Sequence, residues 1–187
     1  TIRASEIDPV WNEISKDLYI VRWYYEESEL LEVMEENHII LGLDTSDAIG
    51  RDAIALTFIN SKDLSLVGSA TINETNLIRF AKFLSDLMIK YPKLILIPER
   101  KSSAQSIIDS LLIHLPRAGV DPFKRIYNHV VDNKDERQKD FQEIQTPLNR
   151  RTTAFYDKWK KVIGFNTTGQ SRELLYSTVL QNAAKES

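Results

Sequence analysis

The hydrophobic pattern alternates short unbroken apolar runs with longer segments whose apolar residues recur every three or four positions. The apolar runs predict strands over 38–44, 53–60, 64–72 and 94–97. The helical spacing predicts one helix that opens at Asn73-Glu74 and ends at Pro92, and a second from about Ser102 to just before Pro116. Three meandering strands, a helix, a strand and a helix are typical of an α/β fold. We therefore expect a mixed central sheet of about five or more strands flanked by helices.

The segment before His38 has a different character, because it mixes polar residues with several tryptophans and tyrosines. Its pattern predicts a strand near 18–23 and a short acidic helix over 26–36. We divide the chain accordingly into a lead-in segment, residues 1–37, which packs on the core, and a domain over 38–187.

The pattern after Pro122 is weaker but still divides into elements. A strand is expected over 125–131 and a helix over 152–162, with two aromatic side chains of that helix pointing inward. A loop over 164–169 and a last helix from Ser171 complete the chain.

Composition and charge narrow the class of protein. The chain has 187 residues, no cysteine and a formal net charge of -3. Without cysteine it has no disulfide, thiolate zinc site or thiol nucleophile. The small negative net charge argues against a protein that binds nucleic acid through its overall charge, so any contact with nucleic acid must come from local basic patches. The sequence has neither a secretory signal pattern nor an apolar run of the ~20 residues that a membrane span needs, and we expect a cytoplasmic protein.

Two of the predicted strands run directly into a carboxylate. The apolar run that begins at Ile39 ends at Asp44, and the run that begins at Leu94 ends at Glu99. Reactive groups of an open α/β sheet lie at the carboxyl ends of its strands. Neighbouring strands lie ~4.8 Å apart, so an acid at each tip can share one divalent cation. Asp52, across the hairpin turn from Asp44, is a third candidate ligand, and the pattern predicts metal-dependent chemistry.

The order of these residues resembles a known family. Gly42-Leu43-Asp44-Thr45-Ser46, then Gly50-Arg51-Asp52, then the apolar strand ending in Glu99 are similar to the nuclease domain of phage terminase large subunits. The loop over 164–169 and the helix after it are similar to a late segment of that domain. The resemblance implies a ribonuclease H-like fold and an endonuclease, dependent on Mg²⁺ or Mn²⁺, that cuts concatemeric viral DNA during packaging.

The same resemblance implies roles for the acids and a set of partners. Asp44 would be the ligand shared by two metal ions, Glu99 a ligand of one, and Asp52 an accessory ligand. The family's third core acid lies in a later motif of paired aspartates, so we expect it beyond Ser187 and regard the domain over 38–187 as C-terminally incomplete. ATP would bind only a separate upstream domain. The implied partners are double-stranded DNA, that ATPase domain, the small terminase subunit and the portal, in the host cytoplasm.

Several basic residues are candidates for contacts with DNA phosphates, although charge runs are usually solvated surface. They are Lys101, Arg150, Arg151, Lys158, Lys160 and Lys161. Other interpretations stay open, since Asp44 alone is also typical of a turn and Glu99 alone of a helix cap. The chain could be a junction-resolvase or transposase-like nuclease with the same acids, or a non-catalytic α/β interaction module.

Overall fold

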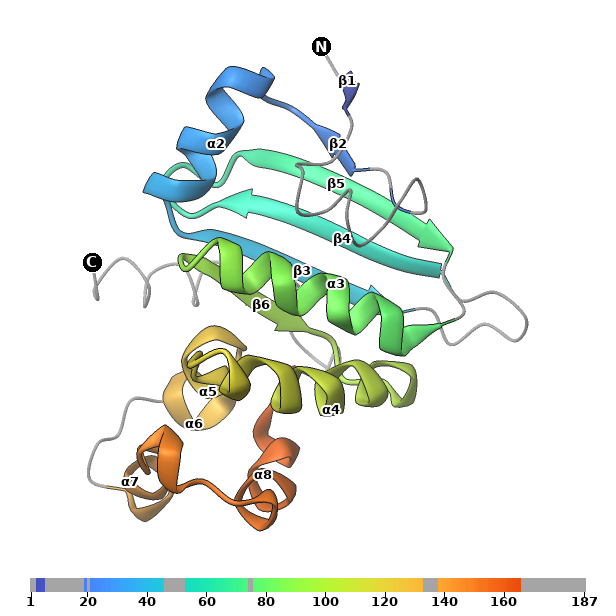
Figure 1. Cartoon of the computed structure of the whole chain (residues 1–187). Coiled ribbons are helices and arrows are strands. Elements are labelled where there is room, and N and C mark those ends of the chain that lie inside the picture. The colour runs from blue at the N-terminus through green and yellow to red at the C-terminus, as the bar shows by residue number, and fades with distance from the viewer. Residues whose placement is uncertain are drawn as a thin grey trace.

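The structure is a computed structural model that describes residues 3–5, 19, 21–45, 53–73, 76–132 and 138–165. Its centre is a six-stranded sheet in the order β1-β2-β5-β4-β3-β6 (Figure 1). The strands are β1 (Arg3–Ser5), β2 (Val21–Trp23), β3 (Ile39–Thr45), β4 (Ala53–Asn60), β5 (Leu66–Asn73) and β6 (Leu94–Pro98). Neighbouring strands are antiparallel except β3 and β6, which pair in parallel. The predicted mixed sheet is therefore confirmed.

Helices flank this sheet, also as predicted (Figure 1). The longer ones are α2 (Glu27–Glu36), α3 (Leu77–Lys90) and α4 (Ser102–Arg117). The shorter ones are α5 (Pro122–Arg125), α6 (His129–Asp132), α7 (Lys139–Ile144) and α8 (Thr153–Trp159), with 3₁₀ turns at Leu148–Arg150 and Lys160–Val162. Among the described helices, none is long and apolar enough to cross a membrane.

The alternation of side chains along a strand divides β3 and β6 between two faces of the sheet. Ile39, Leu41 and Leu43 belong to the large core that the buried faces of α3 and α4 complete. On the other face Ile40 and Ile97 form a second, smaller cluster with Tyr127 and Phe165. Asp44 lies four residues after Ile40 and Glu99 two residues after Ile97, so both acids are on the same face as this second cluster. That face is opposite the large core.

The lead-in segment is part of the sheet, because it supplies β1 and β2. Tyr19, Val21 and Trp23 are buried in the large core. The rings of Trp23 and Phe58 pack at a tilt, with 5.0 Å between their centroids, and Trp23 leaves no room for a side chain at Gly68. A Cβ atom at Gly68 would lie 2.5 Å from Trp23 Cε3. The two described strands before His38, β1 and β2, thus form one edge of the same sheet.

The strand expected over 125–131 does not form, so this prediction is wrong. Ile126 forms a single parallel bridge with Leu96, and Asn128 a single antiparallel bridge with Ile163. The Asn128 side chain then accepts a hydrogen bond from the N–H of Val131 at 2.9 Å, which turns the chain into α6. A local side-chain bond of this kind competes with strand pairing, so no continuous strand forms here.

Two predicted helix boundaries also shift. The first turn of α3 is capped by Asn76, whose side chain accepts a hydrogen bond from the N–H of Arg79 at 3.1 Å, so the helix starts later than Asn73-Glu74. Helix α4 continues through Pro116 to Arg117. A proline in the last turn removes one backbone hydrogen bond where the helix is about to end, and the helix tolerates it there.

Candidate metal site at the ends of β3 and β6

The parallel pairing of β3 and β6 sets the position of the two acids. Leu43 lies opposite Pro98, and the N–H of Glu99 donates to the carbonyl of Leu43 at 3.1 Å. Asp44 directly follows Leu43, and Glu99 directly follows Pro98. Asp44 and Glu99 therefore meet at one edge of the sheet, as the strand pattern predicts.

A lysine lies between the two carboxylates. Lys101 Nζ is 2.9 Å from Asp44 Oδ1 and 3.5 Å from Glu99 Oε2. The Glu99 side chain is only 4% exposed, whereas those of Asp44 and Lys101 are 29% and 26% exposed. The hydrogen bond to Asp44, together with the negative charge of both acids, raises the pKa of Lys101 above its usual value. Lys101 is therefore a firmly charged cation that faces two anions.

A late segment of the chain closes the outer edge of β6 beside Glu99. The N–H of Phe165 donates to the carbonyl of Pro98 at 3.1 Å, and the N–H of Arg100 donates to the carbonyl of Phe165 at 2.7 Å. Gly164 has φ +88°, and a Cβ atom there would lie 2.9 Å from the Pro98 carbonyl oxygen. Only a glycine lets the backbone approach this closely in that conformation. These bonds hold both sides of Glu99 in extended backbone.

The start of α4 is tied to the end of β3 by a second contact. Thr45 is buried, and its Oγ1 lies 2.6 Å from Ser103 Oγ. Lys101 is the N-cap residue of α4. The Thr45–Ser103 bond thus fixes the backbone from which the Lys101 side chain reaches the two acids. The sequence pattern gives no signal for these roles of Thr45 and Ser103, whereas for Gly164 a glycine after a helix is the available signal.

The structure does not bring most of the other predicted residues to this edge. Asp52 lies outside the described residues, and so does 166–169 of the predicted loop. Lys158 pairs with Glu143 at 2.7 Å and Lys160 with Asp109 at 3.7 Å. Arg150 and Lys161 are exposed. Figure 1 shows α8, which neighbours these basic residues, separated from β3 by α4. Of the predicted phosphate contacts, only Lys101 lies at the two acids.

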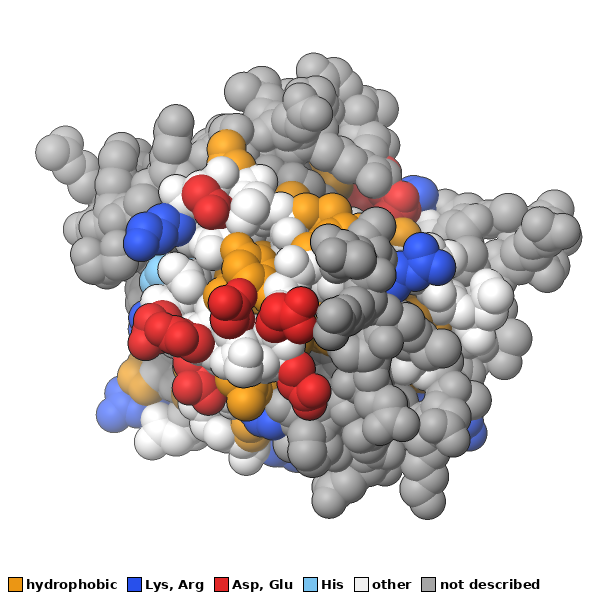
Figure 2. Space-filling view, turned by 90° about the horizontal axis from the view of Figure 1, so that it is seen from above, with side chains coloured by type: hydrophobic (Ala, Val, Ile, Leu, Met, Phe, Trp, Pro, Cys, Tyr) orange, Lys and Arg blue, Asp and Glu red, His pale blue; other side chains and the backbone are white. Residues whose placement is uncertain are grey.

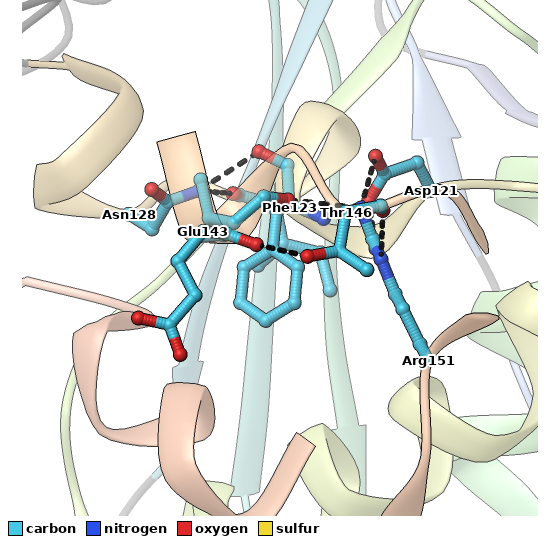
Figure 3. Close-up of polar contacts among 8 residues, drawn as sticks. Asp121, Phe123, Asn128, Glu143, Thr146 and Arg151 are labelled. Atoms are coloured by element: carbon cyan, nitrogen blue, oxygen red, sulfur yellow. Dashed lines mark hydrogen bonds and ion pairs between the residues drawn. The ribbon is translucent and has the colours of Figure 1, made fainter. Parts of the chain in front are cut away.

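Arg151 has a structural role instead of the predicted contact with DNA. Its side chain is 2% exposed, and its guanidinium donates to both oxygens of Asp121 at 2.7 and 2.9 Å (Figure 3). It also donates to the carbonyls of Ile144 and Thr146. The guanidinium carbon lies 4.9 Å from the Phe155 ring centroid. A guanidinium enclosed in this way cannot reach a phosphate, so the prediction for Arg151 is wrong.

The two acids at the sheet edge fit a divalent cation in their chemistry. Carboxylate oxygens are the ligands that Mg²⁺ and Mn²⁺ prefer, and the positive group that the pair already holds is a stand-in for such an ion. Within the described part of the chain, no group of three or more His, Asp or Glu side chains gathers around one point. The described residues therefore bring together two carboxylates that could hold such an ion.

Comparison with known proteins adds no family to this geometry. No protein-family model matches the chain, and no curated protein matches it. The resemblance to terminase nuclease domains therefore rests on the sequence alone. The evidence for function comes from Asp44, Glu99 and Lys101 and from the strands that position them.

Proposed function

We propose that the chain is a metal-dependent DNA endonuclease with a ribonuclease H-like fold, the nuclease part of a viral DNA-packaging terminase. The observation that carries the proposal is the meeting of Asp44 and Glu99 around one positive group at the ends of two parallel strands. The sheet supports the fold, because β5, β4 and β3 are antiparallel and β6 joins β3 in parallel after α3.

Asp44 and Glu99 would hold the Mg²⁺ or Mn²⁺ ions, and Asp52 is the candidate for a further ligand. When bound, such ions supply an activated water and stabilise the leaving oxygen of a phosphodiester. The chain contributes rigidity, since β3 is paired on both sides, with β4 and with β6. Burial of Glu99 also shields part of the site from water, which strengthens its electrostatic interactions.

The surface charge supports an approach of DNA from the strand ends. The exposed glutamates of α2 form an acidic surface (Figure 2). They are Glu26, Glu27, Glu29, Glu32, Glu35 and Glu36. Helix α2 leads into the start of β3, whereas Asp44 lies near the opposite end of that strand. By this proposal DNA is repelled at the α2 end, and at the other end the N-terminus of α4 offers partial positive charge to a phosphate.

A cleavage assay with matched variants tests the proposal. The chain is incubated with linear double-stranded DNA and Mn²⁺, and with a four-way DNA junction in parallel. We expect cleavage of linear DNA that falls to background in the double variant Asp44→Asn, Glu99→Gln. Asp86→Asn is the control, because Asp86 is also a carboxylate paired with a lysine at 2.9 Å but lies on α3.

The outcomes separate the possible functions. Unchanged cleavage in the double variant would refute the site. Cleavage confined to the four-way junction would favour a junction resolvase with the same acids. Loss of Mn²⁺ binding in the double variant, measured by calorimetry, would show that these two side chains bind the metal. Absence of a specific heat of Mn²⁺ binding in the wild type would favour a non-catalytic interaction module.

A further inference from the structure

The contact of Lys101 with both acids has a consequence for metal binding. Its ammonium group lies 2.9 Å from one carboxylate and 3.5 Å from the other, so a single cation bridges the two strand ends. A divalent cation held by the same two carboxylates would share this space with a positive charge. The repulsion between a dication and an ammonium group at such short range makes the two states mutually exclusive.

The attachment of Lys101 allows it to leave without disturbing the backbone. The residue is the N-cap of α4, and the Thr45–Ser103 bond anchors that turn to β3. A lysine has a flexible four-carbon stem, so the ammonium can move to solvent while the α4 N-terminus stays fixed. Its side chain is 26% exposed, which leaves a route outward.

We propose that Lys101 is a built-in counter-cation, which holds Asp44 and Glu99 together in the metal-free protein and competes with the divalent cation for them. This inference rests on the proposed function, because it assumes that the two acids bind a metal. Lys101 then lowers the affinity of the site for the metal, since every binding event must first displace the ammonium. It also lowers the repulsion between the two acids when no metal is bound.

Calorimetric titration with MnCl₂ tests the competition on the whole chain. Lys101→Met and Lys101→Gln remove both ion contacts of a partly exposed lysine, and we expect them to bind Mn²⁺ about three- to tenfold more tightly. Lys101→Arg keeps the charge and stays near the wild-type affinity. Lys82→Met is the matched control, because Lys82 also lies 2.9 Å from an aspartate, Asp86, but has one partner on a helix surface.

Thermal melting of the metal-free proteins gives a second readout. Lys101→Met melts at a lower temperature than the wild type because it removes the ammonium group that contacts both acids. Saturating Mn²⁺ raises its melting temperature by more than it raises that of the wild type, whereas Lys82→Met gains as much as the wild type.

Unchanged or weaker Mn²⁺ binding in both Lys101→Met and Lys101→Gln, with normal binding in the wild type, would overturn the competition and leave the nuclease proposal standing. Tighter binding in Lys101→Arg as well would also overturn it, because that variant keeps the charge. Absence of Mn²⁺ binding in the wild type and in every variant would instead overturn the proposed function, and this inference with it.

Discussion

Two of the ion-pair clusters in the described part of the chain, those of Arg151 and Lys101, differ in charge balance and in burial. At Arg151 one guanidinium meets one carboxylate, that of Asp121, with its side chain 2% exposed. At Lys101 one ammonium group faces two carboxylates and remains partly exposed. The first cluster is neutral and its donors are used on Asp121 and two backbone carbonyls. In the second cluster, one ammonium group is shared by two acids.

This difference distinguishes a structural pair from a candidate site. A buried ion pair is tolerated when its geometry is good and its hydrogen bonds are satisfied, and Arg151 meets both conditions. It joins the segment after α7 to the start of α5 and stacks on aromatic rings. The Lys101 cluster lies at the ends of two strands, and under our proposal it exchanges one cation for another. We therefore assign stability to the Arg151 cluster and propose chemistry at the Lys101 cluster.

The largest effect on stability is expected at Arg151. Its replacement by Met leaves the Asp121 carboxylate and two backbone carbonyls without their partner, so the free energy of unfolding falls by about 3–5 kcal/mol. Arg151→Lys also destabilises, because a point charge cannot make the bidentate contact. Denaturant melts measure both variants. The folded Arg151→Lys protein should bind Mn²⁺ with the wild-type affinity. A changed affinity would mean that the two clusters do not have separate roles.

A smaller effect is expected beside Glu99. Gly164→Ala combines a left-handed backbone with a Cβ atom 2.9 Å from the Pro98 carbonyl oxygen, and we expect a loss of about 2–4 kcal/mol. Gly119→Ala is the control, since Gly119 has φ +78° with nothing within 4 Å, and it costs about 1–2 kcal/mol. Only Gly164→Ala should also weaken Mn²⁺ binding. Equal losses in the two variants would mean that the Phe165 segment does not support the site.

The hydroxyl of Thr45 gives a finer test. Thr45→Val removes the bond to Ser103 and lowers the free energy of unfolding by about 0.5–1.5 kcal/mol. Thr146→Val removes a comparable hydroxyl contact, with the carbonyl of Glu143, next to Arg151. Calorimetry should detect a change in Mn²⁺ affinity in Thr45→Val alone. The same change in both variants would show that the anchor of α4 is not specific to the site.

The smallest effect concerns pH. The pKa of Lys101 is raised above 10.5, chiefly by its hydrogen bond to Asp44. The stability that its ion pairs provide is therefore complete below pH 10.5 and is lost as the pH rises through the higher pKa of the folded protein. Melting temperatures of the wild type and Lys101→Met should differ at neutral pH and converge in strong alkali. A constant difference across this range would show that the ion pairs contribute nothing.

The sequence predicts the strands well because β3, β4 and β6 are apolar runs bounded by turns, and their order brings Asp44 and Glu99 together. It does not separate Lys101 from Arg151, since both stand in basic dipeptides, Arg100-Lys101 and Arg150-Arg151. The difference comes from partners distant in sequence. Asp121 lies thirty residues before Arg151, and the position of Lys101 depends on the register of β3 with β6. Neither of these relationships can be predicted from the residues next to Lys101 or Arg151.

A crystal of the chain soaked in MnCl₂ tests the central claim most directly, with anomalous scattering to locate the ion. We predict an anomalous peak in contact with the carboxylates of both Asp44 and Glu99, and the Lys101 ammonium group displaced from them. A peak elsewhere, or no peak with Lys101 still bridging the two acids, would contradict the account.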